Sequence, residues 1–214
     1  MNPRRQVVKA ILLGDYGVGK TSFFRRTNES DLLIRSTDSW DERMPSLSVD
    51  KCSKTVIASN NKPVQIDLWD TAGAERYRTL TLTYYRNVSA VIFMYRTDQP
   101  SSLANMRLWI ADAKTYIPSD TALVLLGNHV TDKDESVSVR EGDAFAASND
   151  ITAHIRVSIR SASERELTTV LERVVEEVIK ERKSRRYHDF GCNSVCLHDQ
   201  VNRGSGGDKR LKCC

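Results

Sequence analysis

Apolar runs of five to eight residues recur along the chain and are separated by stretches of helical periodicity. The nearly continuous runs, which are typical of central strands in a parallel sheet, are 7–13, 88–95 and 122–127. Runs that alternate with polar residues are 64–69 and 155–159. Helical patterns lie at roughly 21–27, 101–116, 139–148 and 164–183. This order of strands and helices predicts an α/β domain whose sheet is covered by helices on both faces.

A hairpin is predicted before the run at 64–69. Residues 54–57 read as a strand, and the polar turn 59–62 connects the two runs. One edge of an otherwise parallel sheet is therefore expected to be antiparallel. We expect about six strands and about five helices in one domain over residues 1–183, followed by a disordered basic tail over 184–214.

The turn between the first strand and the first helix carries the most specific pattern in the chain. It reads Gly14-Asp15-Tyr16-Gly17-Val18-Gly19-Lys20-Thr21, followed by Ser22, and fits Gly-x-x-x-x-Gly-Lys-[Ser/Thr]. Glycines let backbone N–H groups curl around an anion, and the start of a helix adds partial positive charge. Lys20 is predicted to reach the β- and γ-phosphates of a nucleotide, and the Thr21 hydroxyl to bind Mg²⁺. A chance glycine turn is the alternative, which the flanking strand and helix disfavour.

Charge is distributed unevenly along the 214 residues. The whole chain and its last 34 residues each carry a formal net charge of +4, so the preceding body is neutral. A neutral body argues against nucleic-acid binding, and a basic tail suits a solvated linker or an anionic membrane surface. The sequence contains no run of 18 apolar residues and no secretory signal is visible, so neither a transmembrane helix nor secretion is expected. Four of the five cysteines lie in the last 23 residues, which favours a reducing cytosolic setting over a disulfide framework.

A second motif, Asp70-Thr71-Ala72-Gly73, closes the run at 64–69. An Asp at this point can hold Mg²⁺ beside the glycine loop, and the Gly73 N–H can approach a γ-phosphate. Residues 69–77 as a whole resemble Trp-Asp-Thr-Ala-Gly-Gln-Glu-Arg-Phe/Tyr of the Ras-superfamily small GTPases, and most closely the Rab branch. Residues 46–50 resemble the Rab effector segment Thr-Ile-Gly-Val-Asp. Further Rab-like segments are 84–86, 98–103 and the terminal Cys213-Cys214.

The resemblance implies the small-GTPase fold of the P-loop NTPases and a bound GTP or GDP. It implies Mg²⁺ ligands at Thr21, Ser46 and Asp70, and GTP hydrolysis as the activity. Effector proteins would bind the segments 46–50 and 69–77 once GTP orders them, and an exchange factor would reload the site. Vesicle trafficking is the process that the Rab likeness implies.

Several positions depart from the family pattern. Ala74 stands where the family has the Gln that orients the attacking water, and a methyl group cannot do this. We therefore expect slow hydrolysis and assign no catalytic residue, although another residue could compensate. Tyr16, usually Ser or Gly, is expected to crowd the γ-phosphate. Ser46 keeps the hydroxyl of the usual Thr, and Lys51 replaces a Phe. Arg96, where Rabs often carry Asp, is interpreted as a solvated strand end.

Base recognition is also altered. Asn128, His129 and Thr131 stand where the family has Asn-Lys-x-Asp. Thr131 lacks the carboxylate that accepts two hydrogen bonds from guanine, and Asp132 could replace it only after a loop shift. Ser158-Ile159-Arg160 stands where the family has Ser-Ala-Lys, and the Ile159 backbone N–H can meet guanine O6. GTP binding is expected to be weaker and less selective than is usual in the family.

The tail ends in Cys213-Cys214, which resembles a double geranylgeranylation signal. Two lipids give stable attachment, so the resemblance implies an anchor on the cytoplasmic face of an intracellular membrane, with a cytosolic pool. Prenylation machinery and a lipid-extracting chaperone are the implied partners. Cys192 and Cys196 are expected to be free thiols, with acylation or metal binding as alternatives.

Two other functions are alternatives to a GTP-binding switch. One is a pseudoGTPase that acts as a constitutive protein-binding scaffold, with weak or absent nucleotide binding. The nucleotide content of the purified chain distinguishes this scaffold from a switch. A P-loop kinase is disfavoured, because Asp-Thr-Ala-Gly is a switch motif.

Overall fold

The computed structural model describes residues 6–28, 50–71, 85–130 and 136–196, with side chains for all of these except 50 and 186–196. The described elements are β1 (Gln6–Leu13), α1 (Lys20–Asn28), β2 (Asp50–Ile57), β3 (Pro63–Asp70), β4 (Ala90–Arg96), α3 (Pro100–Tyr116), β5 (Ala122–Asn128), α4 (Val139–Ser148), β6 (Ala153–Val157) and α5 (Glu164–Cys196).

The six strands form one sheet in the order β2-β3-β1-β4-β5-β6. Four neighbouring pairs are parallel, and β2 runs antiparallel to β3 at the edge. Every residue of β5 is buried, as its nearly continuous apolar sequence predicts for an inner strand. The α/β fold with a mostly parallel sheet and one antiparallel edge is therefore confirmed, and the hairpin prediction is confirmed with it.

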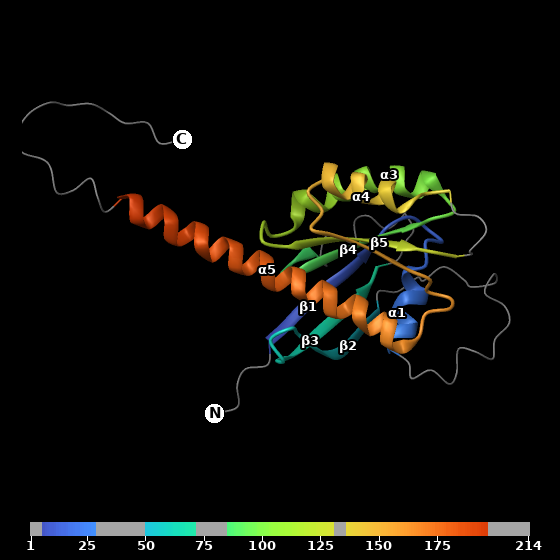
Figure 1. The fold of residues 1–214 in the computed structure, drawn as a ribbon, viewed down its shortest axis with the longest axis horizontal. Helices are drawn as coiled ribbons and strands as arrows, with labels where there is room; N and C mark the ends of the chain where they lie inside the picture. Colours follow the sequence, from blue (N-terminus) through green and yellow to red (C-terminus); the bar gives the residue numbers. More distant parts are fainter. Residues whose placement is uncertain (1–5, 29–49, 72–84, 131–135, 197–214) are drawn as a thin grey trace, which may run out of the picture.

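Helices cover the sheet on both faces (Figure 1). Alternate residues of β1 point to opposite sides, so Ala10 and Leu12 join the core under α1 and α5, whereas Ile11 and Leu13 join the core under α3. On the α5 side, Leu167, Leu171 and Val174 form one apolar stripe and are fully or almost fully buried. The two cores hold the carboxyl ends of the parallel strands at one edge of the sheet, where the glycine loop lies.

Two predicted boundaries are wrong. The last strand ends at Val157 and begins at Ala153, two residues earlier than predicted, so Ser158 and Ile159 belong to the loop that follows it. Helix α5 continues past Lys183 to Cys196 and projects beyond the sheet (Figure 1), where a disordered tail was expected. The extension begins with Ser184, Arg185 and Arg186 and continues a helix whose first part is packed against the sheet, so it adds turns without needing a core of its own. The division into a domain ending at 183 and a tail stays a prediction.

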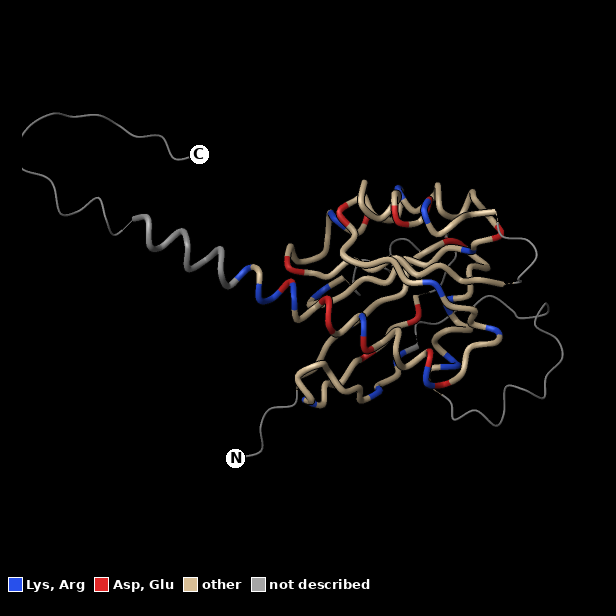
Figure 2. The backbone as a smooth tube through the Cα atoms, viewed as in Figure 1, with Lys and Arg blue, Asp and Glu red and all other residues tan. Residues whose placement is uncertain are grey.

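Charges of both signs are interspersed over the body (Figure 2). Among the helices that the structure describes, none combines the length and the apolar character needed to cross a membrane.

Candidate nucleotide-binding site

The glycine loop connects the end of β1 to the start of α1, and its backbone requires glycine at two tight points. Gly14 has φ 147° and Gly19 has φ 105°, values that favour glycine. A side chain at Gly14 would collide with the Met94 carbonyl oxygen of β4, and one at Gly19 would lie 2.6 Å from Asn128 Nδ2. The loop is therefore packed against the ends of β4 and β5, and positions 14 and 19 have no room for a side chain.

Lys20 is the first residue of α1, and its side chain folds back toward the glycine loop. Its ammonium group donates hydrogen bonds to the carbonyl oxygens of Gly14 at 2.8 Å and Asp15 at 2.7 Å. Only 5% of Lys20 is exposed, so the positive charge is held in a fixed place under the loop. A buried, positioned ammonium group next to backbone N–H groups at a helix start is suited to a phosphate anion. Ser22, two residues after Lys20, is half-buried, and Tyr16 is exposed.

Thr21 and Asp70 meet at the junction of α1 and β3. The Thr21 hydroxyl donates a hydrogen bond to Asp70 Oδ2 at 2.6 Å, although the two residues are 49 positions apart. Asp70 is fully buried at the end of β3, and the hydroxyl of the next residue, Thr71, donates to the Leu12 carbonyl oxygen. Hydroxyl and carboxylate oxygens side by side are the donors that Mg²⁺ prefers, so these residues fit a magnesium ion.

Asn128, the last residue of β5, connects the glycine loop to the loop after β6. Its Nδ2 donates to the Val18 carbonyl oxygen at 3.0 Å, and its Oδ1 accepts from the Ile159 N–H at 3.2 Å. Both partners are buried, with Val18 at 0% and Ile159 at 1% exposed. The Ile159 N–H, predicted to meet guanine O6, is therefore engaged within the chain. Ser158 is half-buried beside it and Arg160 is exposed.

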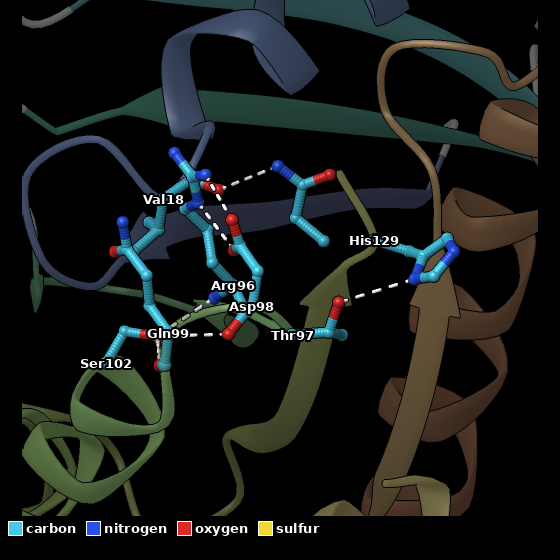
Figure 3. Close-up of polar contacts among 8 residues, drawn as sticks. Val18, Arg96, Thr97, Asp98, Gln99, Ser102 and His129 are labelled. Carbon is cyan, nitrogen blue, oxygen red and sulfur yellow. Dashed lines mark hydrogen bonds and ion pairs between the residues drawn. The ribbon is translucent and has the colours of Figure 1, made fainter. Parts of the chain in front are cut away.

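His129 lies directly after Asn128 and is fixed from two sides. Its backbone N–H donates to the Val157 carbonyl oxygen at 2.9 Å. Its ring Nδ1 lies 3.3 Å from the Thr97 hydroxyl (Figure 3). The other predicted site residues lie outside the described part of the chain: Ser46, Gly73, Ala74, Thr131, Asp132, Cys213 and Cys214.

Asp15 has a role that the sequence did not reveal. Its carboxylate accepts hydrogen bonds from Asn105 Nδ2 and Trp109 Nε1 of α3, each at 2.8 Å. These bonds tie the glycine loop to α3. On the opposite side, Arg26 of α1 donates to the carbonyl oxygens of Ile159 and Ala162, which ties α1 to the loop after β6. Only the helical spacing of Asn105 and Trp109 could have suggested a shared partner.

Arg96 is not the solvated strand end that the sequence suggested. Its guanidinium group donates to both carboxylate oxygens of Asp98, at 2.8 and 2.5 Å, and only 26% of its side chain is exposed. Hydrogen bonds from Arg96 hold the pKa of Asp98 below its ordinary value, against desolvation that raises it. Figure 3 shows this pair beside Val18 of the glycine loop.

The predicted effector segment 69–77 is described only at its start. The Trp69 ring on β3 lies between two ammonium groups, with the Lys9 Nζ 5.1 Å and the Lys51 Nζ 5.7 Å from its centroid. Lys51 also forms an ion pair with Asp67 at 2.7 Å. The replacement of an aromatic residue by Lys51 therefore gives cation–π contacts in place of ring packing.

A glycine loop over a helix start, a buried lysine beneath it and a paired Thr and Asp define the P-loop class of nucleotide-binding α/β proteins. A model of the Ras family matches residues 9–180, so this chain belongs to the Ras family.

Its relatives carry Rab-type names. Ras-related protein SEC4 of Saccharomyces cerevisiae is 28% identical over 212 residues, which cover 97% of this chain and 91% of that protein. GTP-binding protein ypt3 of Schizosaccharomyces pombe is 32% identical over 160 residues, covering 72% and 69%. Ras-related protein Rab-26 of Drosophila melanogaster is 28% identical over 195 residues, and this chain spans 47% of its length. The chain is thus a divergent Rab-like member of the Ras superfamily.

Proposed function

We propose that this chain is a GTP-binding switch of Rab type that acts in vesicle trafficking. The observation that supports it most is the contact between the Thr21 hydroxyl and Asp70 Oδ2 at 2.6 Å, beside the buried Lys20 ammonium group. This geometry offers a cation for the phosphates and two oxygen donors for a metal where the start of α1 meets the end of β3. The names of the relatives, Ras-related and GTP-binding proteins, agree with this function.

Hydrolysis of GTP is the proposed reaction, and it is slow. Lys20 would hold the β- and γ-phosphates, and Thr21, Asp70 and Ser46 would supply the oxygen donors for Mg²⁺. When bound, Mg²⁺ would supply positive charge for the phosphate oxygens. Ala74 can neither donate nor accept a hydrogen bond, so the attacking water lacks the group that would orient it. The resting state is therefore loaded with GTP.

Single-turnover hydrolysis tests the proposed rate. Ala74→Gln should accelerate the release of phosphate by about tenfold or more, which corresponds to at least about 1.4 kcal/mol of barrier. Lys20→Ala is the control for loading and should not retain GTP. Equal rates for the parent and Ala74→Gln would show that residue 74 does not limit hydrolysis.

The switch is proposed to sit on the cytoplasmic face of an intracellular membrane and to exchange with a cytosolic pool. Geranylgeranyl groups on Cys213 and Cys214 would supply the anchor, which requires prenylation machinery and a lipid-extracting chaperone. Effectors would bind the segments 46–50 and 69–77, and an exchange factor would load GTP. Mass spectrometry of the chain from a prenylating host checks the anchor, and an unmodified C-terminus would contradict it.

One observation favours a second function, that of a constitutive binding scaffold. Asn128 uses both ends of its amide group inside the chain, on Val18 and Ile159. A base that bound to this amide group or to the Ile159 N–H would have to exchange these internal bonds, which makes binding less favourable. Nucleotide extracted from the purified chain decides between the two functions. A stoichiometric amount of GTP or GDP supports the switch, and an empty chain supports the scaffold.

A further inference from the structure

The sheet order locates the place where a ligand of this fold binds. From β1 the chain proceeds through α1 to β2 and β3 on one side, and β4 lies on the other side. The carboxyl ends of β1 and β4 therefore flank the topological switch point, and ligands of open α/β sheets bind in the crevice at such a point. Arg96 is the last residue of β4 and lies at this crevice.

The crevice has two chemically different sides. The phosphate and metal donors, Lys20, Thr21 and Asp70, lie on the side of β1 and β3. The side of β4 and β5 carries a planar ion pair and an imidazole in place of these donors, as Figure 3 shows for Arg96, Asp98 and His129. A nucleotide whose phosphates occupy the first side must extend its nucleoside portion toward the second.

The ion pair is held by a network of hydrogen bonds at the turn between β4 and α3. The Arg96 N–H donates to the Ser102 hydroxyl at 3.0 Å, and the Gln99 N–H donates to the Arg96 carbonyl oxygen at 3.2 Å. Thr97 links the turn to β5, because its N–H donates to the Asn128 carbonyl oxygen at 3.1 Å. The guanidinium group therefore starts from a fixed backbone, and Asp98 fixes its plane by engaging two of its nitrogens.

We propose that Arg96, oriented by Asp98, binds the nucleoside portion of the bound nucleotide and slows its release. This inference rests on the proposed function, since it assigns a further residue to the same site. Arg96 and Asp98 together are neutral, so they add no attraction for phosphate. They instead offer the flat face of the guanidinium group to the sugar and base.

The release rate of a fluorescent GDP analogue from the full chain, chased with unlabelled GDP, tests the proposal. Arg96→Met keeps the length of the side chain and removes its donors, and should release the analogue about tenfold faster with little change in the association rate. Asp98→Asn should give a smaller acceleration in the same direction. The double variant should equal Arg96→Met, because Asp98 acts through Arg96. Arg96→Lys should fall between parent and Arg96→Met, because an ammonium group restores charge but not the planar fork.

Lys114→Met is the matched control. It breaks a 3.0 Å ion pair with Asp150 at the far end of α3, and release should match that of the parent. A parent chain that binds the analogue while Arg96→Met and Asp98→Asn release it at the parental rate overturns the inference alone. Equal acceleration in Lys114→Met also overturns it, because the effect would then be a general loosening. A parent chain that binds no analogue overturns the proposed function and the inference with it.

Discussion

Replacing Asn128 by Ala tests how the site is held together. Its amide group joins the glycine loop to the loop after β6, because it donates to the Val18 carbonyl oxygen at 3.0 Å and accepts from the Ile159 N–H at 3.2 Å. Ala removes both bonds and leaves a carbonyl oxygen and an N–H group in an interior that water hardly reaches.

The expected cost follows from those two groups. Each buried polar group that loses its partner costs about 1–3 kcal/mol, so Asn128→Ala should lower the free energy of unfolding by about 2–5 kcal/mol. The slope of that free energy against urea concentration should not change, because the fold stays the same.

Urea denaturation without nucleotide, followed by circular dichroism, measures the effect. Asn105→Ala is the control, because it removes one amide hydrogen bond, to Asp15, at an exposed position. It should cost less than about 1 kcal/mol. If Asn128→Ala were no more destabilising than Asn105→Ala, the internal bonds of Asn128 would not hold the loops and the reasoning would fail.

Three further outcomes are expected. Gly142→Ala should destabilise the chain, although Ala favours helix by about 1 kcal/mol. The added methyl group would lie 2.6 Å from Nε2 of the buried His154 side chain and 2.9 Å from the Tyr95 hydroxyl. Thermal denaturation should show a smaller loss in a His154→Ala background, because only the Tyr95 contact remains there. Thr21→Val should abolish the effect of Mg²⁺ on nucleotide release while leaving the thermal midpoint near that of the parent, and a retained Mg²⁺ effect would exclude Thr21 as a metal donor. The pKa of Glu176 is lowered chiefly by a hydrogen bond from the Ser59 backbone N–H, so the carboxylate stabilises the fold above its ordinary pKa of 4.5 and this contribution is lost as the pH falls below it. Urea titrations at several pH values should show that the free energy of unfolding declines less steeply toward acid pH in Glu176→Gln than in the parent. An unchanged decline would contradict the assignment.

The sheet could be predicted because its inner strands are apolar over nearly their whole length. β1, β4 and β5 lie between two layers of helices, so few of their positions need to be polar. The end of β6 was predicted two residues too late, because Ile159 continues the apolar alternation of Ile155 and Val157. In the structure Ile159 is buried, but it belongs to the loop that follows the strand. The end of α5 was missed because an apolar stripe was taken as the sign of a helix. The residues after Lys183 carry no such stripe and extend the helix through continuity with its packed part.

The candidate site was predictable only where spacing determines chemistry. The glycine loop and Asp70 follow from a motif, and the structure places Thr21 and Asp70 in contact. The Arg96–Asp98 pair depends on the turn after β4, whose backbone hydrogen bonds no local pattern predicts. The bonds from Asp15 to α3 likewise join residues about 90 positions apart, and a single sequence contains no signal for such pairs.

The central claim is that the loop from Gly14 to Thr21 binds a nucleoside polyphosphate together with Mg²⁺. Titration of a fluorescent GTP analogue into the full chain, with Mg²⁺ and then with a chelator, tests it directly. The account predicts saturable binding at micromolar protein that weakens on chelation and is lost in Lys20→Ala. Binding that is equal in the parent and in Lys20→Ala, or no binding to the parent at all, would contradict it.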